Sequence, residues 1–163
     1  MLVVSDTSAI SNLALLGLLH SLREQFGKVV MPEAVAHELA SLADAPALSL
    51  IQDASLAGWL ETVVLTDEEQ AFAGTLKLDP GESEAISLAR TRSADLLCMD
   101  EAAGRAVAMG LNLKVKGVLG ILLDEKAAGR VSLIEPLLDK LQSEHGFFIR
   151  ADLRKRVLEV AGE

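Results

Sequence analysis

Four acidic residues lie where the predicted strands and helices of this chain would bring them together. Asp6 and Asp100 each end a short apolar run that predicts a strand, and Glu38 and Glu82 each lie on a predicted helix. The carboxyl ends of parallel strands meet at one edge of a sheet, which is where open α/β folds bind ligands. Carboxylate oxygens without a neighbouring base are typical of a Mg²⁺ or Mn²⁺ site.

Mutual repulsion between these carboxylates strengthens the metal hypothesis. Two carboxylates ~4 Å apart repel by about 4 kcal/mol at an effective dielectric constant near 20, and each raises the pKa of the other. A divalent cation would compensate this cost. One or two such ions could polarise a phosphodiester and generate a hydroxide nucleophile. The pattern therefore indicates a divalent-metal site.

Helical periodicity separates the informative acids from their neighbours. Glu38 shares a helix face with apolar side chains, so its carboxylate must be solvated, paired or metal-bound. Glu82 lies near the apolar face of its helix, whereas Glu84 points away from that face. Structural roles remain open for two of the acids. Asp6 could serve as a helix N-cap, and Glu82 could be a first-turn acid favoured by the helix dipole.

Other polar residues could support such a site. Ser8 could hydrogen-bond a carboxylate or a metal-bound water, or could simply begin a helix. Glu84 and Glu101 are the acids adjacent in sequence to the third and fourth candidates. Arg105 could contact a phosphate, or could form a surface pair with Glu101 four residues before it. The three histidines are scattered and lack metal-ligand spacing.

The elements that must position these residues alternate along the chain. Short β-like runs alternate with helical patterns, which predicts βαβ units and a mostly parallel sheet in a three-layer α/β/α fold. Residues 1–130 form the predicted catalytic domain, and residues 131–163 form an appended α-β-α element, packed on the same domain, with residues 147–149 as its strand. Strands are predicted near 2–5, 28–31, 59–65, 95–99 and 112–116, and helices near 7–15, 18–26, 32–42, 47–57, 81–92, 101–109 and 117–128.

Composition restricts the class of protein. The 163 residues are 50% hydrophobic but only 3% aromatic, so the core must consist of Ala, Leu, Val and Ile. The single cysteine, Cys98, excludes an internal disulfide and a Cys-based zinc site, and its apolar surroundings predict a buried, inert thiol. No apolar run is long enough to span a membrane, which favours a cytoplasmic protein. The net charge of −9 disfavours a broad nucleic-acid-binding surface, although basic residues concentrate between Arg150 and Arg156.

The order of the acidic motifs resembles that of the PIN-domain nucleases, especially the VapC-like toxins of bacterial and archaeal toxin–antitoxin pairs. The resemblance covers about residues 1–130. Two residues depart from the family pattern: Glu82 replaces the usual aspartate, and Met99 replaces the basic residue that often precedes the fourth acid. The matching segments are Val3-Val4-Ser5-Asp6-Thr7-Ser8, Pro32 to Leu39, Gly81-Glu82 through Ala89, and Leu96 to Asp100.

This resemblance implies a PIN-like fold and Mg²⁺- or Mn²⁺-dependent cleavage of single-stranded RNA. Asp6, Glu38, Glu82 and Asp100 would be the catalytic and metal-binding residues. It also implies a cognate antitoxin protein as partner and a homodimer. Two other classes stay open from the residues: a catalytically inert PIN-fold interaction module, and a phosphoacceptor or phosphatase-type α/β domain.

Overall fold

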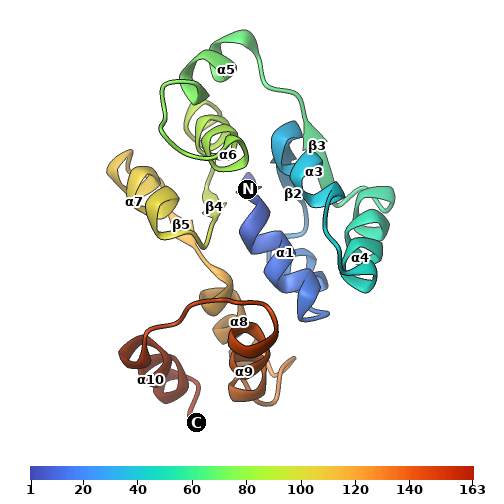
Figure 1. The fold of residues 1–163 in the computed structure, drawn as a ribbon, viewed down its shortest axis with the longest axis vertical. Coiled ribbons are helices and arrows are strands. Elements are labelled where there is room, and N and C mark those ends of the chain that lie inside the picture. The colour runs from blue at the N-terminus through green and yellow to red at the C-terminus, as the bar shows by residue number, and fades with distance from the viewer. The chain divides into compact units, whose positions relative to one another are not determined.

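One parallel sheet contains every strand of the protein, which is described by a computed structural model of residues 1–163. The strand order is β3-β2-β1-β4-β5 (Figure 1). The central strand β1 (Val3–Ser5) pairs with β2 (Val29–Pro32) and β4 (Leu96–Cys98), while β3 (Leu60–Val63) and β5 (Val115–Lys116) form the two edges. The three inner strands are largely buried runs rich in Val and Leu, as expected for parallel strands covered on both faces. The predicted parallel α/β architecture is therefore confirmed.

The chain forms two compact units, Met1–Gly117 and Val118–Glu163. The first unit contains the sheet and seven helices, and each helix predicted there is present. The helix between β3 and α6 was not predicted, although Thr66 and Glu69 form a capping box at its start. The helices are α1 (Thr7–Leu15), α2 (His20–Phe26), α3 (Glu33–Ala40), α4 (Ala45–Leu56), α5 (Asp67–Ala73), α6 (Pro80–Thr91) and α7 (Ala102–Gly110).

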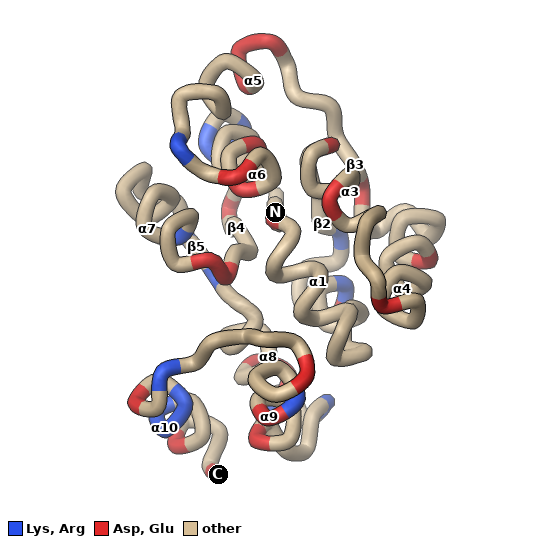
Figure 2. The backbone as a smooth tube through the Cα atoms, in the orientation of Figure 1, with Lys and Arg blue, Asp and Glu red and all other residues tan.

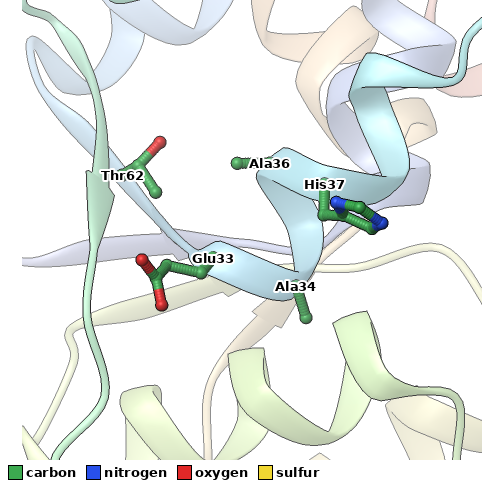
Figure 3. A pocket seen from close by; sticks show the side chains of 5 residues that line it. All are labelled: Glu33, Ala34, Ala36, His37 and Thr62. Carbon is green, nitrogen blue, oxygen red and sulfur yellow. The ribbon is translucent and has the colours of Figure 1, made fainter.

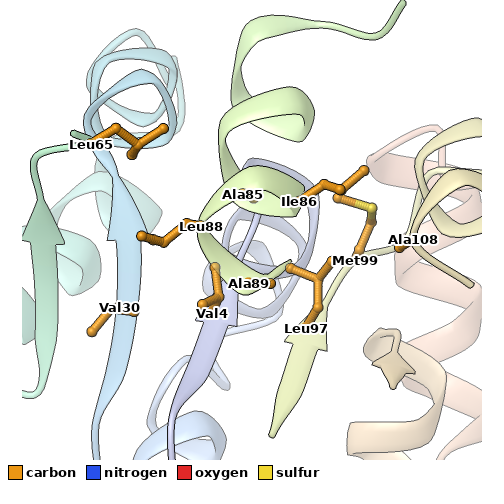
Figure 4. Packing of buried hydrophobic residues seen from close by; sticks show 10 residues of the cluster. All are labelled: Val4, Val30, Leu65, Ala85, Ile86, Leu88, Ala89, Leu97, Met99 and Ala108. Atoms are coloured by element: carbon orange, nitrogen blue, oxygen red, sulfur yellow. The ribbon is translucent and has the colours of Figure 1, made fainter. Parts of the chain in front are cut away.

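The main core of the first unit lies between the sheet and α6. Val4, Val30 and Leu97 come from three neighbouring strands and pack against the small and branched side chains of α6 (Figure 4). Because side chains alternate along a strand, the buried Val3 and Val29 point to the opposite face of the sheet. Helices thus cover both faces of the sheet, which gives the three predicted layers.

The second unit contains only helices: α8 (Val118–Ala127), α9 (Glu135–Glu144) and α10 (Ala151–Val160). The strand predicted at residues 147–149 is wrong. A strand needs a neighbouring strand to pair with, and this unit has none. The Phe147 N–H instead donates to the Leu141 carbonyl at 3.0 Å, and Phe148 is 83% exposed. The helix α8 belongs to this unit, whereas the predicted limit at residue 130 grouped it with the first domain.

Charge is unevenly distributed along the chain (Figure 2). The first unit carries 16 of the 24 acidic residues but only eight of the 15 basic ones. None of the helices combines the length and apolar character that crossing a bilayer requires. Cys98 is a free thiol that is buried as predicted, and burial raises its pKa to about 12.

Candidate active site

A cavity of about 290 Å³ lies at the carboxyl end of β1. It is called the acidic cavity below, because acidic and hydroxyl side chains dominate its lining. Five of the site residues proposed from sequence, including Ser8 and Glu101, come together there. The lining residues are Asp6, Thr7, Ser8, Ser11, Glu38, Asp79, Glu82 and Glu101, from four separate segments of the chain.

Asp6 is the most deeply buried acid of this group, with 1% of its surface exposed. Its carboxylate caps α1 by accepting from the Ala9 N–H at 3.0 Å, and it accepts from the Ser8 hydroxyl at 2.8 Å. The pKa of Asp6 is raised to about 7, chiefly by burial and to a smaller extent by the charges of Asp100 and Glu82, against the lowering effect of the two hydrogen bonds. The N-cap interpretation is correct, and it coexists with a strongly perturbed carboxyl group.

Asp100 is connected to Asp6 through Ser8, although it does not line the acidic cavity. The Asp100 N–H donates to the Ser8 hydroxyl oxygen at 3.2 Å, and the Asn12 side-chain amide donates to the Asp100 carboxylate, also at 3.2 Å. Ser8 therefore joins the ends of β1 and β4. Arg105 donates to the Met99 carbonyl at 2.9 Å, so its guanidinium helps to fix the turn that carries Asp100.

Glu38 reaches the acidic cavity from α3 and is held by both carboxylate oxygens. Thr7 donates its hydroxyl proton to Oε2, and the Gly81 N–H donates to Oε1 at 2.9 Å. A Cβ at position 81 would lie 2.9 Å from the Glu38 carboxyl carbon, so any larger residue would require the Glu38 carboxylate to move. Glu38 thereby connects α1, α3 and the start of α6.

Glu82 lies on the first turn of α6 and faces the acidic cavity. Its pKa is raised, chiefly by burial and then by the charges of Asp79, Glu101 and Glu38. Glu84 lies elsewhere: it accepts from the Ala34 N–H at 3.1 Å and from the Gln70 side chain at 3.3 Å. Its role is to connect α6 with α3 and α5.

Several residues of the site were not foreseen from sequence. Thr7 lies within the first matching segment, and Asp79 lies two residues before the third. Asn12 lies four residues after Ser8 on the same face of α1, so helical spacing offered a signal for it. Gly117 offered none. A Cβ there would lie 2.6 Å from an Asp100 carboxylate oxygen and 3.1 Å from Arg105, so its contribution is space that only the tertiary structure reveals.

The donor set around the acidic cavity consists of oxygen atoms, which suits a hard divalent cation. No group of three or more His, Cys, Asp or Glu side chains is arranged to hold a metal ion by itself. Mg²⁺ commonly keeps several waters and binds proteins through one or two carboxylates. The residues therefore fit a hydrated Mg²⁺ or Mn²⁺ ion, and do not fit a closed protein cage of the kind that structural zinc occupies.

The sequence matches a model from a scan of protein families. The model of a family described as a PIN domain matches residues 2–163. PIN domains are typically nucleases and generally use divalent metal ions such as Mg²⁺. A search of curated proteins finds no match. Because the family model spans nearly the whole sequence, this chain belongs to the PIN-domain family.

Proposed function

We propose that this protein is a metal-dependent endonuclease that cuts single-stranded RNA. The observation that carries the proposal is the acidic cavity, in which the buried Asp6 carboxylate lies beside Glu82 and is linked to Asp100. Crowded, desolvated carboxylates are unfavourable unless a cation compensates their charge. Membership of a nuclease family supplies the reaction class that suits such a cation.

Asp6, Glu38, Glu82 and Asp100 would hold the ion, directly or through water. Glu38 has each of its oxygens engaged by a protein donor, so its share would be water-mediated or would use a remaining lone pair. When bound, a divalent ion supplies Lewis-acid polarisation of the scissile phosphate and lowers the pKa of a coordinated water.

The neighbouring side chains hold these carboxylates in position. The single Ser8 hydroxyl proton is directed at Asp6, while the same oxygen accepts from the Asp100 backbone. Asn12 holds the Asp100 carboxylate from α1, and Thr7 holds Glu38. Because these side chains are already held in place, they need not rearrange during the reaction, which is the main advantage of a pre-organised centre.

Cleavage of a labelled single-stranded RNA tests the proposal. We expect cutting with Mg²⁺ or Mn²⁺, none with chelator, and a loss of roughly 100-fold or more in Asp6→Asn and Glu82→Gln. Glu84→Gln is the matched control, because it removes the same charge two residues away on α6 but outside the acidic cavity. Metal-dependent cleavage that survives in both site variants would refute the proposal.

The biological setting that we propose is that of a toxin neutralised by an antitoxin protein, acting as a homodimer. The resemblance of the acidic motifs to VapC-like toxins supports this part. Expression of the wild-type protein in a bacterial host should arrest growth, and the Asp6→Asn variant should not. Multi-angle light scattering tests the dimer, and a monomeric mass at high protein concentration would contradict it.

A catalytically inert interaction module remains the second candidate, and one observation favours it. No three acidic or histidine side chains converge as direct metal ligands, and each oxygen of Glu38 already accepts a hydrogen bond from Thr7 or Gly81. Titration calorimetry separates the two functions. Absence of binding at millimolar Mg²⁺ and Mn²⁺ would favour the inert module.

A further inference from the structure

The edge strand β3 leaves part of its backbone unpaired on the side away from β2. The Val29 N–H of β2 donates to the Trp59 carbonyl at 2.8 Å, so the residue just before β3 faces β2. Backbone groups alternate in direction along a strand, so the N–H and C=O groups of Leu60 and Thr62 point away from β2. Leu60 is 1% exposed, so its groups are covered, whereas Thr62 is exposed and no strand pairs with it. The outward N–H and C=O groups of Thr62 can therefore pair with one residue of another extended segment.

Two adjoining cavities lie beside this edge, and together they are called the β3 groove. The first, of about 620 Å³, is lined by Glu33, Ala34, Ala36, His37 and Thr62. Figure 3 shows Thr62 on β3 and Ala36 on α3 on opposite sides of this space, with Glu33 near its end. The second, of about 460 Å³, shares Ala36 and Thr62 and is mainly apolar. Its apolar lining includes Met31, Leu39, Ile51 and Leu56.

The surroundings of the β3 groove indicate a protein as its occupant. Leu56, the last residue of α4, is 87% exposed, and Val64, just after β3, is 67% exposed. Large apolar side chains at such exposure, next to an open strand edge, favour contact with another polypeptide.

Charge indicates which polypeptide fits. Glu33 is the one Asp or Glu residue that lines either cavity, and no Lys or Arg lines them. The unit that carries the groove is strongly acidic, which disfavours a second copy of the same surface. A basic segment is the complementary partner.

We propose that the β3 groove binds an extended segment of a partner protein that carries a Lys or Arg two residues from a Leu or Ile. The segment lies beside β3 and pairs with the outward backbone groups of Thr62. Side chains two residues apart share one face of a strand and lie about 7 Å apart. The apolar side chain enters the cavity lined by Leu56, and the cation reaches Glu33. This binding does not depend on the proposed nuclease activity.

Fluorescence anisotropy with a labelled peptide tests the inference on the full chain. The probe is the heptapeptide Thr-Lys-Val-Leu-Val-Lys-Thr, which presents the required spacing in either strand direction. Comparison peptides replace both lysines by glutamate, or the leucine by aspartate. We expect the lysine peptide to bind roughly tenfold more tightly than the glutamate peptide, and the aspartate peptide to bind weakly.

Two protein variants locate the contact. Glu33→Lys should reverse the preference, so that the glutamate peptide binds more tightly than the lysine peptide. The matched control is Glu68→Lys, which makes the same change at an exposed first-turn position of α5, outside the groove, and should leave the preference unchanged. Thr62→Pro removes an outward N–H that an edge strand can spare, so it should weaken the lysine peptide while the thermal melt stays cooperative.

Three results would overturn the inference. The first is equal binding of the lysine and glutamate peptides. The second is a preference that Glu33→Lys leaves unchanged. The third is a wild-type dimer that Thr62→Pro converts to a monomer in light scattering, because the occupant would then be a second copy of this chain.

Discussion

At the scale of single residues, Asp6 shows how one side chain serves both the fold and the site. It caps α1 through the Ala9 N–H, and it also places a carboxylate with a pKa near 7 between Glu82 and Asp100. An unperturbed aspartate would be ionised at pH 5, whereas Asp6 stays protonated until the pH approaches 7. The acidic cavity is therefore a source of instability in the metal-free protein.

Replacing Asp6 by asparagine should stabilise the metal-free protein at alkaline pH. The pKa of Asp6 rises from 3.8 to about 7 on folding, so the wild type loses stability as pH increases through this interval, and the loss is complete above pH 7. Asparagine keeps an oxygen for the Ala9 N–H and carries no charge. Between pH 5 and pH 8 the advantage of Asp6→Asn should grow by about 3 kcal/mol.

Urea unfolding in the presence of chelator at the two pH values measures this change. Asp53→Asn is the control, because Asp53 is an exposed acid on α4 and should give no pH-dependent difference. A constant difference between Asp6→Asn and wild type at both pH values would show that the buried carboxyl is not the source of the effect.

Substitution of Gly81 should disturb the position of Glu38. A Cβ at this position would displace the Glu38 carboxylate, so Gly81→Ala should destabilise the protein by about 1–3 kcal/mol and reduce RNA cleavage. Gly74→Ala is a suitable control, since its backbone is helical and a Cβ there meets only ordinary contacts at 3.5 Å. Urea unfolding and a cleavage assay report the two effects.

A second variant tests the cause of this loss. If the collision with Glu38 is responsible, the double variant Gly81→Ala, Glu38→Ala should lose less stability than the sum of the two single variants. Strict additivity would point instead to the start of α6 itself.

At the scale of elements, the α5–α6 pair depends on one buried acid. Glu69 accepts from Arg92 at 2.8 and 3.0 Å, from the Thr91 hydroxyl at 3.0 Å and from the Thr66 N–H at 2.8 Å. These bonds, with Arg92 first among them, lower the pKa of Glu69 to about 2. The helix α5 is short, so this network, more than its intrinsic propensity, holds it against α6.

Glu69→Gln should therefore destabilise the protein by about 2 kcal/mol at pH 7. The loss is smaller than for a fully buried ion pair, because the Arg92 side chain is 38% exposed and water screens its charge. The stabilisation by Glu69 is present above its unfolded pKa of 4.5 and is lost as pH falls through 2. The difference from wild type should thus shrink at acid pH. Urea unfolding across this range tests it, with the exposed Glu68→Gln as control.

At the scale of the whole molecule, a net charge of −9 makes cations stabilising by screening alone. Specific binding at the acidic cavity must therefore be separated from this general effect. At equal ionic strength, MgCl₂ or MnCl₂ should raise the melting temperature more than NaCl, by about 2–6 °C at saturating metal. Thermal melts provide the measurement. The extra increase should vanish in Glu82→Gln and persist in Glu84→Gln, and an equal increase with NaCl would exclude specific binding.

Much of this protein is determined by local sequence. The apolar runs at residues 2–5 and 96–99, and the caps and periodicity of the helices, specify the order of strands and helices because these signals depend on near neighbours. A parallel three-layer α/β fold followed from them, and the resemblance of the acidic motifs to those of PIN domains implied the PIN-like type. The exception at residues 147–149 has the same origin, since a strand-like run forms no strand without an adjacent edge to pair with.

Tertiary structure alone decided how the acidic cavity is assembled. Ser8 joins Asp6 to Asp100 across 92 residues, and Gly81 leaves room for a carboxylate 43 residues away. Neither relation leaves a periodic trace in the sequence, because each depends on the space between side chains brought together by the sheet. The open edge of β3 is likewise a property of strand order, and it became visible only once the sheet was complete.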